Sequence, residues 1–229
     1  MEKNYTSYCG LDCKECSYKE SYGCGGCIAT EGTPFWANGD SVKCEVAECN
    51  KAEGKGFCGE CGKFPCETLN RFAYDKEQGD DGKRIENCKV IKARLVKAAR
   101  DGIDPIGVCG HHCDYCFMGQ WCGSCRSDYN CCSFAVLFED KKCPNVSCAD
   151  EKGLDGCYDC LDLENCIVGY YGNENEYAAK ATAIYIKKYG KEKYTETLKK
   201  AIEGGMEYAK DLDGCGSVEK AVELLEKWG

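Results

Sequence analysis

Apolar residues recur at helical spacing in the segment 84–102. The positions near one face of this segment are Ile85, Cys88, Ile91, Leu95 and Val96. A step of three or four residues between apolar positions is typical of an amphipathic helix, and a glycine such as Gly102 suits the position just beyond a helix end. The pattern therefore predicts a helix, with Cys88 as a small core residue.

Three more helices are predicted near the C-terminus, over residues 174–190, 191–210 and 217–228. The positions at helical spacing in the first of them are Tyr177, Ala181, Ile184 and Tyr185. Gly190 is a stop signal, and Ser217 is suited to cap the last helix at its N-terminus. A shorter helical segment, residues 67–74, follows Cys66.

Elsewhere the pattern is irregular. No run of four or more alternating apolar and polar residues predicts a strand. Glycine-rich and polar stretches with many cysteines occupy residues 9–66 and 109–166. The predicted fold class is mainly α plus loop, with small irregular modules organised by metal, short α-helices and a C-terminal helical segment.

The chain has 229 residues and is acidic, with 39 Asp and Glu against 30 Lys and Arg. A nucleic-acid binder needs a cationic surface, so no nucleic-acid partner is expected. No apolar run approaches the roughly 20 residues of a membrane span. The first residues, MEKNYTSYC, lack the basic and apolar stretch of a signal peptide. We therefore expect a cytoplasmic protein without a membrane partner.

Cysteine changes this picture, because the chain contains 24 of them. Such a density is typical of short secreted disulfide scaffolds. In a reducing cytosol, persistent structural disulfides are rare, and dense thiols without a secretion signal indicate metal binding. Disulfides in an exported protein whose signal has been removed are the alternative.

Twenty of these cysteines recur in the same order. The first cysteine block contains Cys9, Cys13, Cys16, Cys24, Cys27, Cys44, Cys49, Cys58, Cys61 and Cys66. The second cysteine block contains Cys109, Cys113, Cys116, Cys122, Cys125, Cys143, Cys148, Cys157, Cys160 and Cys166. Corresponding cysteines lie between 98 residues apart (Cys24 and Cys122) and 100 residues apart (Cys9 and Cys109). The pattern indicates a tandem duplication, and all twenty are predicted metal ligands.

Spacing is kept within each short motif and slips mainly between motifs. Loops tolerate changes of length, whereas ligands around one ion do not. We therefore predict three parts: a metal-binding repeat with a trailing helix (1–104), a second metal-binding repeat (105–168) and a C-terminal helical segment (169–229).

Two metals compete for these thiols. Paired C-x2-C units are common in zinc sites, because two thiolates two residues apart can hold one tetrahedral ion. Each block, however, begins with the triplet C-x3-C-x2-C and ends with a second triplet. Three thiols within eight or nine residues, completed by a distant fourth, are typical of a [4Fe–4S] cluster. Iron–sulfur clusters are favoured, and zinc ions are the alternative.

The remaining candidates are weaker. His111 and His112 occur only in the second block, where the first has Leu11 and Asp12, so neither is expected to be a ligand. The pair Cys131 and Cys132 has no base nearby in sequence and is expected to be a spare ligand or a packed thiol, not a nucleophile. Radical S-adenosylmethionine enzymes share the C-x3-C-x2-C motif, but no alternation of strands and helices follows it here.

The first block resembles an uncharacterised cysteine-rich family of unknown function, found mainly in anaerobic bacteria and archaea. The resemblance is carried by YCGLDCKEC, GCGGC, CEVAEC and FCGECGKFPCETL, and covers residues 5 to about 100. The second block keeps the cysteine order but has ENC where the first has FPC. The resemblance implies a metal-binding module, and an anaerobic distribution favours iron–sulfur clusters.

The sequence thus predicts a cysteine-rich metalloprotein that holds [4Fe–4S] clusters for electron transfer or another cluster-dependent role. A redox or other protein partner is expected. The alternative is a zinc-stabilised module that presents acidic helices to a protein partner. No enzymatic activity is assigned.

Overall fold

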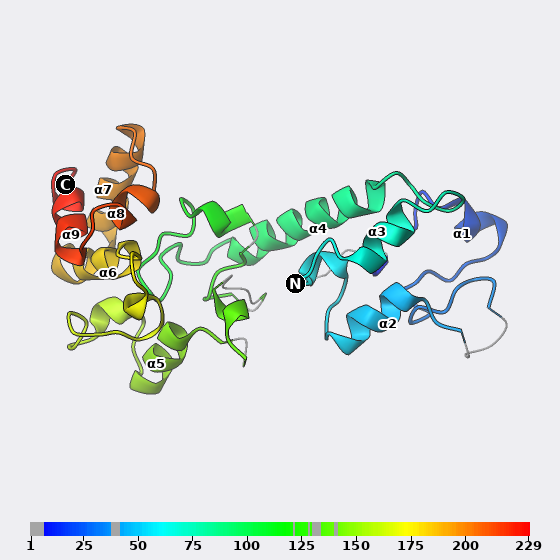
Figure 1. The fold of residues 1–229 in the computed structure, drawn as a ribbon, viewed down its shortest axis with the longest axis horizontal. Helices are drawn as coiled ribbons and strands as arrows, with labels where there is room; N and C mark the ends of the chain where they lie inside the picture. The colour runs from blue at the N-terminus through cyan, green and yellow to red at the C-terminus, as the bar shows by residue number, and fades with distance from the viewer. Residues whose placement is uncertain (1–6, 38–41, 121, 128, 130–133, 140–141) are drawn as a thin grey trace. The chain divides into compact units, whose positions relative to one another are not determined.

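The computed structural model describes residues 7–37, 42–120, 122–127, 129, 134–139 and 142–229 (Figure 1). Cys131 and Cys132 lie outside the described residues. The chain divides into two compact units, Met1–Leu95 and Val96–Gly229. Each unit contains one cysteine block, and the division into three parts at residues 104 and 168 stays a prediction.

The first unit contains short helices joined by loops. They are α1 (Ser17–Ser21), α2 (Glu45–Ala52), the 3-10 turn η1 (Cys58–Glu60), α3 (Glu67–Ala73) and the part of α4 (Lys83–Arg100) up to Leu95. Its buried side chains include Phe57, Leu69, Ile85 and Cys88. Two of these lie on α4, so this helix forms part of the core of the first unit.

The second unit begins with the last turn of α4 and holds the remaining elements. They are the 3-10 turns η2 (Phe117–Gln120) and η3 (Ala135–Leu137), α5 (Pro144–Lys152), the 3-10 turns η4 (Cys157–Asp159) and η5 (Gly169–Gly172), α6 (Ala178–Tyr189), α7 (Lys191–Glu203), α8 (Lys210–Asp213) and α9 (Val218–Glu226). The helices α7, α8 and α9 all contact α6 (Figure 1).

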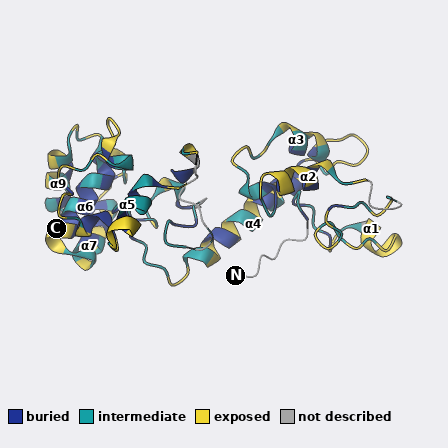
Figure 2. Ribbon diagram, turned by 90° about the horizontal axis from the view of Figure 1, so that it is seen from below, coloured by how far each residue is buried: buried dark blue, intermediate teal, exposed yellow. Residues whose placement is uncertain are grey.

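Helix α6 lies at the centre of this helical group, and more than half of its residues are buried (Figure 2). The core around it includes Tyr185, Tyr194, Leu198, Leu212 and Leu225. Residues in or next to the second cysteine block, among them Ile106, Val108, Leu163 and Tyr171, belong to the same core. The second block is therefore packed on the C-terminal helices through apolar contacts.

The prediction of a mainly α plus loop fold is confirmed, and no strand occurs among the described residues. An isolated bridge joins Ile106 and His112. The helix predicted over 84–102 is α4, and Gly102 beyond it has a φ of 73°. Ser217 caps α9 by accepting a hydrogen bond from the Lys220 amide. In the part of the chain that is described, no helix combines the length and the apolar character of a membrane span.

Two features differ from the expectation. The helix predicted over 191–210 ends at Glu203, because Gly204 and Gly205 follow, and α8 is a separate turn. Helices α2 and α5 were not predicted within the cysteine blocks. Each is only eight or nine residues long, and neither has a strong apolar stripe.

Candidate metal centre

A short helix begins directly after one cysteine in each block. Cys44 occupies the N-cap of α2, and Cys143 occupies the N-cap of α5, both in extended backbone conformation. Each helix carries the next cysteine of its block, Cys49 or Cys148, one turn further on. Because a helix fixes the spacing of its side chains, the paired cysteines of the C-x4-C motif are held by the same rigid element.

A 3-10 turn positions the following C-x2-C pair. In the first block the Cys58 amide donates to the Tyr8 carbonyl at 2.8 Å, and in the second the Cys157 amide donates to the Val108 carbonyl at the same distance. The Cys61 amide then donates to the Cys58 carbonyl at 3.0 Å. These bonds connect the end of each block to the residue just before its first cysteine.

Each block contains a hollow lined by four cysteines. The lining of the first thiol pocket includes Cys49, Cys58, Cys61 and Cys66, and that of the second thiol pocket includes Cys148, Cys157, Cys160 and Cys166. Both hollows are partly open to solvent. The four cysteines correspond one to one between the blocks. The structure therefore brings the same four predicted ligands together twice.

A buried asparagine donates to a cysteine in each thiol pocket. Asn50 Nδ2 lies 3.2 Å from Cys58 Sγ, and Asn145 Nδ2 lies 3.8 Å from Cys157 Sγ. The two asparagines occupy different turns of α2 and α5, so they do not correspond in sequence. An amide that donates to a cysteine sulfur stabilises the thiolate form, which is the form that binds metal.

One thiol of each pocket, that of Cys58 or Cys157, is buried, and the other thiols of the pocket lie near it. Burial raises the pKa of Cys58 to about 12, although the Asn50 amide works to lower it. Burial likewise raises the pKa of Cys157, and Cys148 and Cys166 add to the effect. Neighbouring thiols that oppose one another's ionisation form a site where added positive charge is favourable.

A second group of four cysteines lies in the loops of the first block, and we call Cys9, Cys13, Cys27 and Cys44 the first loop group. A hydrogen bond with Cys13 and burial raise the pKa of Cys27, and the nearby thiols of Cys9 and Cys44 raise it further. The four side chains are therefore within electrostatic reach of one another.

The second loop group consists of the corresponding Cys109, Cys113, Cys125 and Cys143. Burial raises the pKa of Cys109, to which the thiols of Cys125 and Cys143 contribute. The Val108 amide lies 3.4 Å from Cys125 Sγ. Burial also raises the pKa of Cys113 to about 12, with a contribution from Cys125. The same four positions thus come together in both blocks.

In each block, the glycine that follows the first cysteine allows the loop to lie closely against a helix. Gly10 and Gly110 have φ values of 87° and 92°, which favour glycine. A Cβ on Gly10 would meet the backbone of Arg84 on α4, and one on Gly110 would lie 2.8 Å from the amide of Ala183 on α6. The two helix positions are 99 residues apart in sequence. Helices α4 and α6 therefore support corresponding loops.

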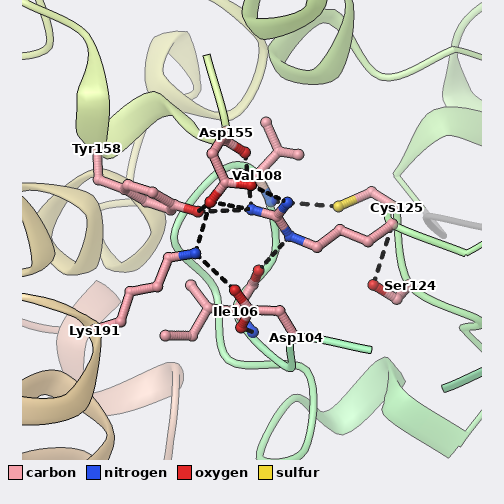
Figure 3. A network of polar contacts seen from close by, with 9 residues as sticks. Asp104, Ile106, Val108, Ser124, Cys125, Asp155, Tyr158 and Lys191 are labelled. Carbon is pink, nitrogen blue, oxygen red and sulfur yellow. Dashed lines mark hydrogen bonds and ion pairs between the residues drawn. The ribbon is translucent and has the colours of Figure 1, made fainter. Parts of the chain in front are cut away.

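In the second block, a polar network connects the segment around Ile106 and Arg126 with Asp155 and Tyr158 (Figure 3). Arg126, next to Cys125, donates to the Ile106 carbonyl at 2.7 Å, to the Asp155 carboxylate at 2.7 Å and to the Tyr158 hydroxyl at 2.6 Å.

Lys191 on α7 completes the network by donating to Asp155 at 2.6 Å and to Asp104 at 2.7 Å. Ile28, Gly56 and Gly59 stand at the positions of Arg126, Asp155 and Tyr158 in the first block. These side chains cannot form the same network there.

The two histidines lie near the second loop group and outside both pocket linings. His111 Nδ1 is 2.8 Å from the Tyr208 hydroxyl, and burial lowers its pKa to about 4. His112 is buried, and neither of its ring nitrogens has a hydrogen-bond partner among the described residues. Their expected status as non-ligands stays a prediction.

The described thiols are not arranged closely enough around one point to coordinate a single metal ion. Among the described residues, no group of three or more His, Cys, Asp or Glu side chains is spaced to hold a metal ion. None of the 22 cysteines described forms a disulfide. The structure is therefore compatible with metal binding through cysteine, but it contains no preformed tetrahedral ion site in these regions.

Other cysteines belong neither to a thiol pocket nor to a loop group. Cys116 is within electrostatic reach of Cys122, and the corresponding pair in the first block is Cys16 and Cys24. Cys88 is fully buried on α4, as expected of a core residue. Asn50, Asn145 and the pocket-lining Lys152 were not predicted, because one polar residue near a cysteine has no sequence signature of its own.

Comparison with known proteins adds one finding. No curated protein and no solved structure matches the chain. A family model described as "Protein of unknown function (DUF3795)" matches residues 5–71, a stretch that contains all ten cysteines of the first block. The first cysteine block is therefore similar to an uncharacterised domain family, as its motifs predicted.

Proposed function

We propose that this protein is an iron–sulfur protein that holds one [4Fe–4S] cluster in each thiol pocket and transfers electrons to a protein partner. The observation that carries the proposal is the hollow lined by four corresponding cysteines in each block. Four cysteine thiolates are the usual ligand set of such a cluster.

The spacing of the thiols supports a cluster over a single ion in these pockets. Thiolates around one zinc ion lie about 2.3 Å from the metal, and hence about 3.8 Å from one another. No three cysteines of the described regions have such an arrangement, yet four of them face a common hollow. A cluster spreads its thiolates over four irons and needs a wider separation.

Electrostatics supports positive charge at the same place. Burial and neighbouring thiols raise the pKa of Cys58 and of Cys157. A metal bound to a thiol removes its proton outright and supplies the missing charge. Because each thiol raises the pKa of its neighbours, a bound metal would favour the thiolate form of all the cysteines in the pocket.

Zinc in the loop groups is the second candidate. Cys13 and Cys27 are in hydrogen-bond contact, which is the closeness expected of two of the four thiolates on one ion, and zinc binding would draw the other two thiols of the group closer. Under this proposal zinc is structural in the loop groups, while the thiol pockets hold the clusters.

Anaerobic purification followed by metal and sulfide analysis tests the proposal. We expect a brown protein that absorbs visible light and contains iron and sulfide in near-equal amounts. Cys61→Ala and Cys160→Ala should each lose about four irons, the content of one cluster. Cys215→Ala is the matched control, since Cys215 lies in neither pocket lining, and it should lose none. A colourless protein with zinc and no sulfide overturns the proposal.

A further inference from the structure

We propose that the two thiol pockets hold clusters of different reduction potential, the second higher than the first, and that Lys152 sets much of the difference. This inference rests on the proposed function, in which each pocket holds a cluster. It follows from the charges around the two pockets, which differ at corresponding positions although the cysteines are the same.

Lys152 ends α5 and lines the second thiol pocket. Its ammonium group lies 3.7 Å from Cys160 Sγ and also hydrogen-bonds with Cys148. The residue 99 positions earlier is Glu53, which lines the first thiol pocket. A cation in contact with two cysteine sulfurs is thus replaced by an anion at the matching place.

Two further lysines support the second pocket from α6. Lys180 donates to the Cys166 carbonyl at 3.0 Å, and Lys187 donates to the Cys160 carbonyl at 2.9 Å. The offset of 99 residues between α4 and α6 places Asp81 and Cys88 at these positions in the first block. Neither can contribute positive charge to the first pocket.

Each block also has charges that would reduce the difference in potential, but they are not in hydrogen-bond contact with the pocket sulfurs. In the first block, Lys55 lines the pocket, and Lys63 lies 3.4 Å from the Glu53 carboxylate, which it partly neutralises. In the second block, Asp162 and Glu164 are exposed in the loop after Cys160 but do not line the pocket. Among these described residues, Lys152 is the one whose charged side chain is in hydrogen-bond contact with pocket sulfurs.

Positive charge near a cluster favours its reduced form. When a donor supplies one electron, the cluster and its thiolates gain one negative charge, and the oxidised donor loses one. An adjacent ammonium group stabilises the product of this step more than the reactant, so the reduction potential rises. A carboxylate at the same place has the opposite effect. The second cluster should therefore be reduced at a higher potential than the first.

The test is a dithionite titration of the intact anaerobic protein, followed by electron paramagnetic resonance. We expect at least two reducible components in the native protein. In Lys152→Glu, the reduction potential of one component should fall by about 59 mV or more. For one electron this shift lowers the ratio of reduced to oxidised cluster at a given potential tenfold. Lys152→Arg, which keeps the charge, should retain the native value.

Matched variants separate charge from structure. Lys199→Glu makes the same change of charge on α7, outside both pocket linings, and should shift neither component. Glu53→Lys should raise the reduction potential of the other component and so reduce the difference between the two potentials. This variant keeps the inference testable if Lys152→Glu fails to assemble its cluster.

The outcomes also separate the inference from the proposed function. Protein without iron and sulfide overturns the proposed function. Intact clusters whose potentials do not change in Lys152→Glu, Lys152→Gln or Glu53→Lys overturn the inference alone. A shift of equal size in Lys199→Glu would also overturn it, because the effect would then be one of net charge.

Discussion

Asn50 donates its side-chain amide both to the Val46 carbonyl at 2.8 Å and to the Cys58 sulfur at 3.2 Å. The first bond lies within α2 and fixes the orientation of the side chain. The second bond is then directed at a buried cysteine of the first thiol pocket. A single helix residue thus holds one of four corresponding thiols in place.

Removal of this donor should weaken metal binding at one pocket. We expect Asn50→Ala to lower the affinity of the first thiol pocket for its metal by about 10- to 100-fold, which is the usual effect of losing a hydrogen bond to a ligand. Metal retention during stepwise chelation measures it. Asn145→Ala should weaken the second pocket instead, while Asn70→Ala on α3 is the control. Equal retention in all three variants would contradict a role for these amides.

The loop groups give a prediction of their own. Cys13→Ala and Cys113→Ala should each remove about one metal site from the protein, because each belongs to a group of four thiols within electrostatic reach of one another. Cys88→Ala and Cys215→Ala should remove none, since one is a core residue and the other lies outside both blocks. Metal content per chain, measured on anaerobic protein, decides between them. Loss of metal in Cys88→Ala would mean that a ligand has been mistaken for a core residue.

Metal removal should affect the two blocks unequally. Both consist of loops and short elements, so we expect bound metal to contribute much of their stability. In the second block, however, the Arg126 network and the apolar core shared with the C-terminal helices remain without metal. We expect residues 9–66 to lose amide protection first on chelation, residues 109–166 to lose less, and α6, α7 and α9 to change least. Hydrogen exchange with and without metal tests this order.

Two results would contradict this account. If residues 9–66 stay as protected without metal as with it, the thiol sites are not structural. If both blocks lose protection equally, the network around Arg126 does not support the second. Arg126→Gln, which removes its ion pair with Asp155, should increase the loss of protection in the second block on chelation, although the apolar core shared with the C-terminal helices remains.

The helices were predictable because their apolar stripes are long. Residues 84–102 and 174–190 each place apolar side chains on one face over three turns or more, and α4 and α6 occupy them. The short α2 and α5 lack such a stripe and depend on tertiary contacts, which a local pattern does not record. Their N-caps are cysteines rather than the usual Ser, Thr, Asp or Asn, so the start signal was also missing.

The grouping of the cysteines could not be predicted from the sequence. Regular spacing predicted twenty cysteines as ligands, but ten thiols in a block can be divided into fours in many ways. The division into a thiol pocket and a loop group depends on where α2, α5 and the 3-10 turns place Cys49, Cys148 and their neighbours. The charge reversal between Glu53 and Lys152 was present in the sequence, but it had no meaning until both lined corresponding pockets.

The ion pair between Asp104 and Lys191 predicts a dependence on pH. Burial works to raise the pKa of Asp104, but the Lys191 ammonium and the Ile106 amide outweigh it and hold the pKa below its usual range. A carboxyl whose folded-state pKa is lowered stabilises the fold above its ordinary pKa of about 3.9, and this contribution is lost as the pH falls through the folded-state value.

Asp104→Asn should therefore lower the free energy of unfolding at neutral pH by about 0.5–1 kcal/mol, a small value because the pair is partly exposed to solvent. The difference from the native protein should vanish as the pH is lowered below 4 and through the lowered folded-state pKa of Asp104. Urea unfolding followed by helical circular dichroism measures it. Asp101→Asn, at an exposed position nearby, is the control. A difference that persists at low pH would mean that packing, not charge, is responsible.

The close approach of Gly110 to α6 gives the last prediction. Its φ of 92° disfavours any other residue, and a Cβ would lie 2.8 Å from the Ala183 amide and 3.0 Å from the Ala183 Cα. Gly110→Ala should therefore carry both backbone strain and a clash, and lower the free energy of unfolding by about 2–4 kcal/mol.

Gly216→Ala is the matched control, because Gly216 has a φ of 79° but nothing within 4 Å of an added Cβ. Strain alone should cost about 1 kcal/mol there. The clash at Gly110 would also displace the neighbouring Cys109, so metal content of the second block should fall in Gly110→Ala and stay unchanged in Gly216→Ala. Equal losses of stability in the two variants, with metal retained in both, would mean that α6 does not hold the cysteine loop as closely as the structure places it.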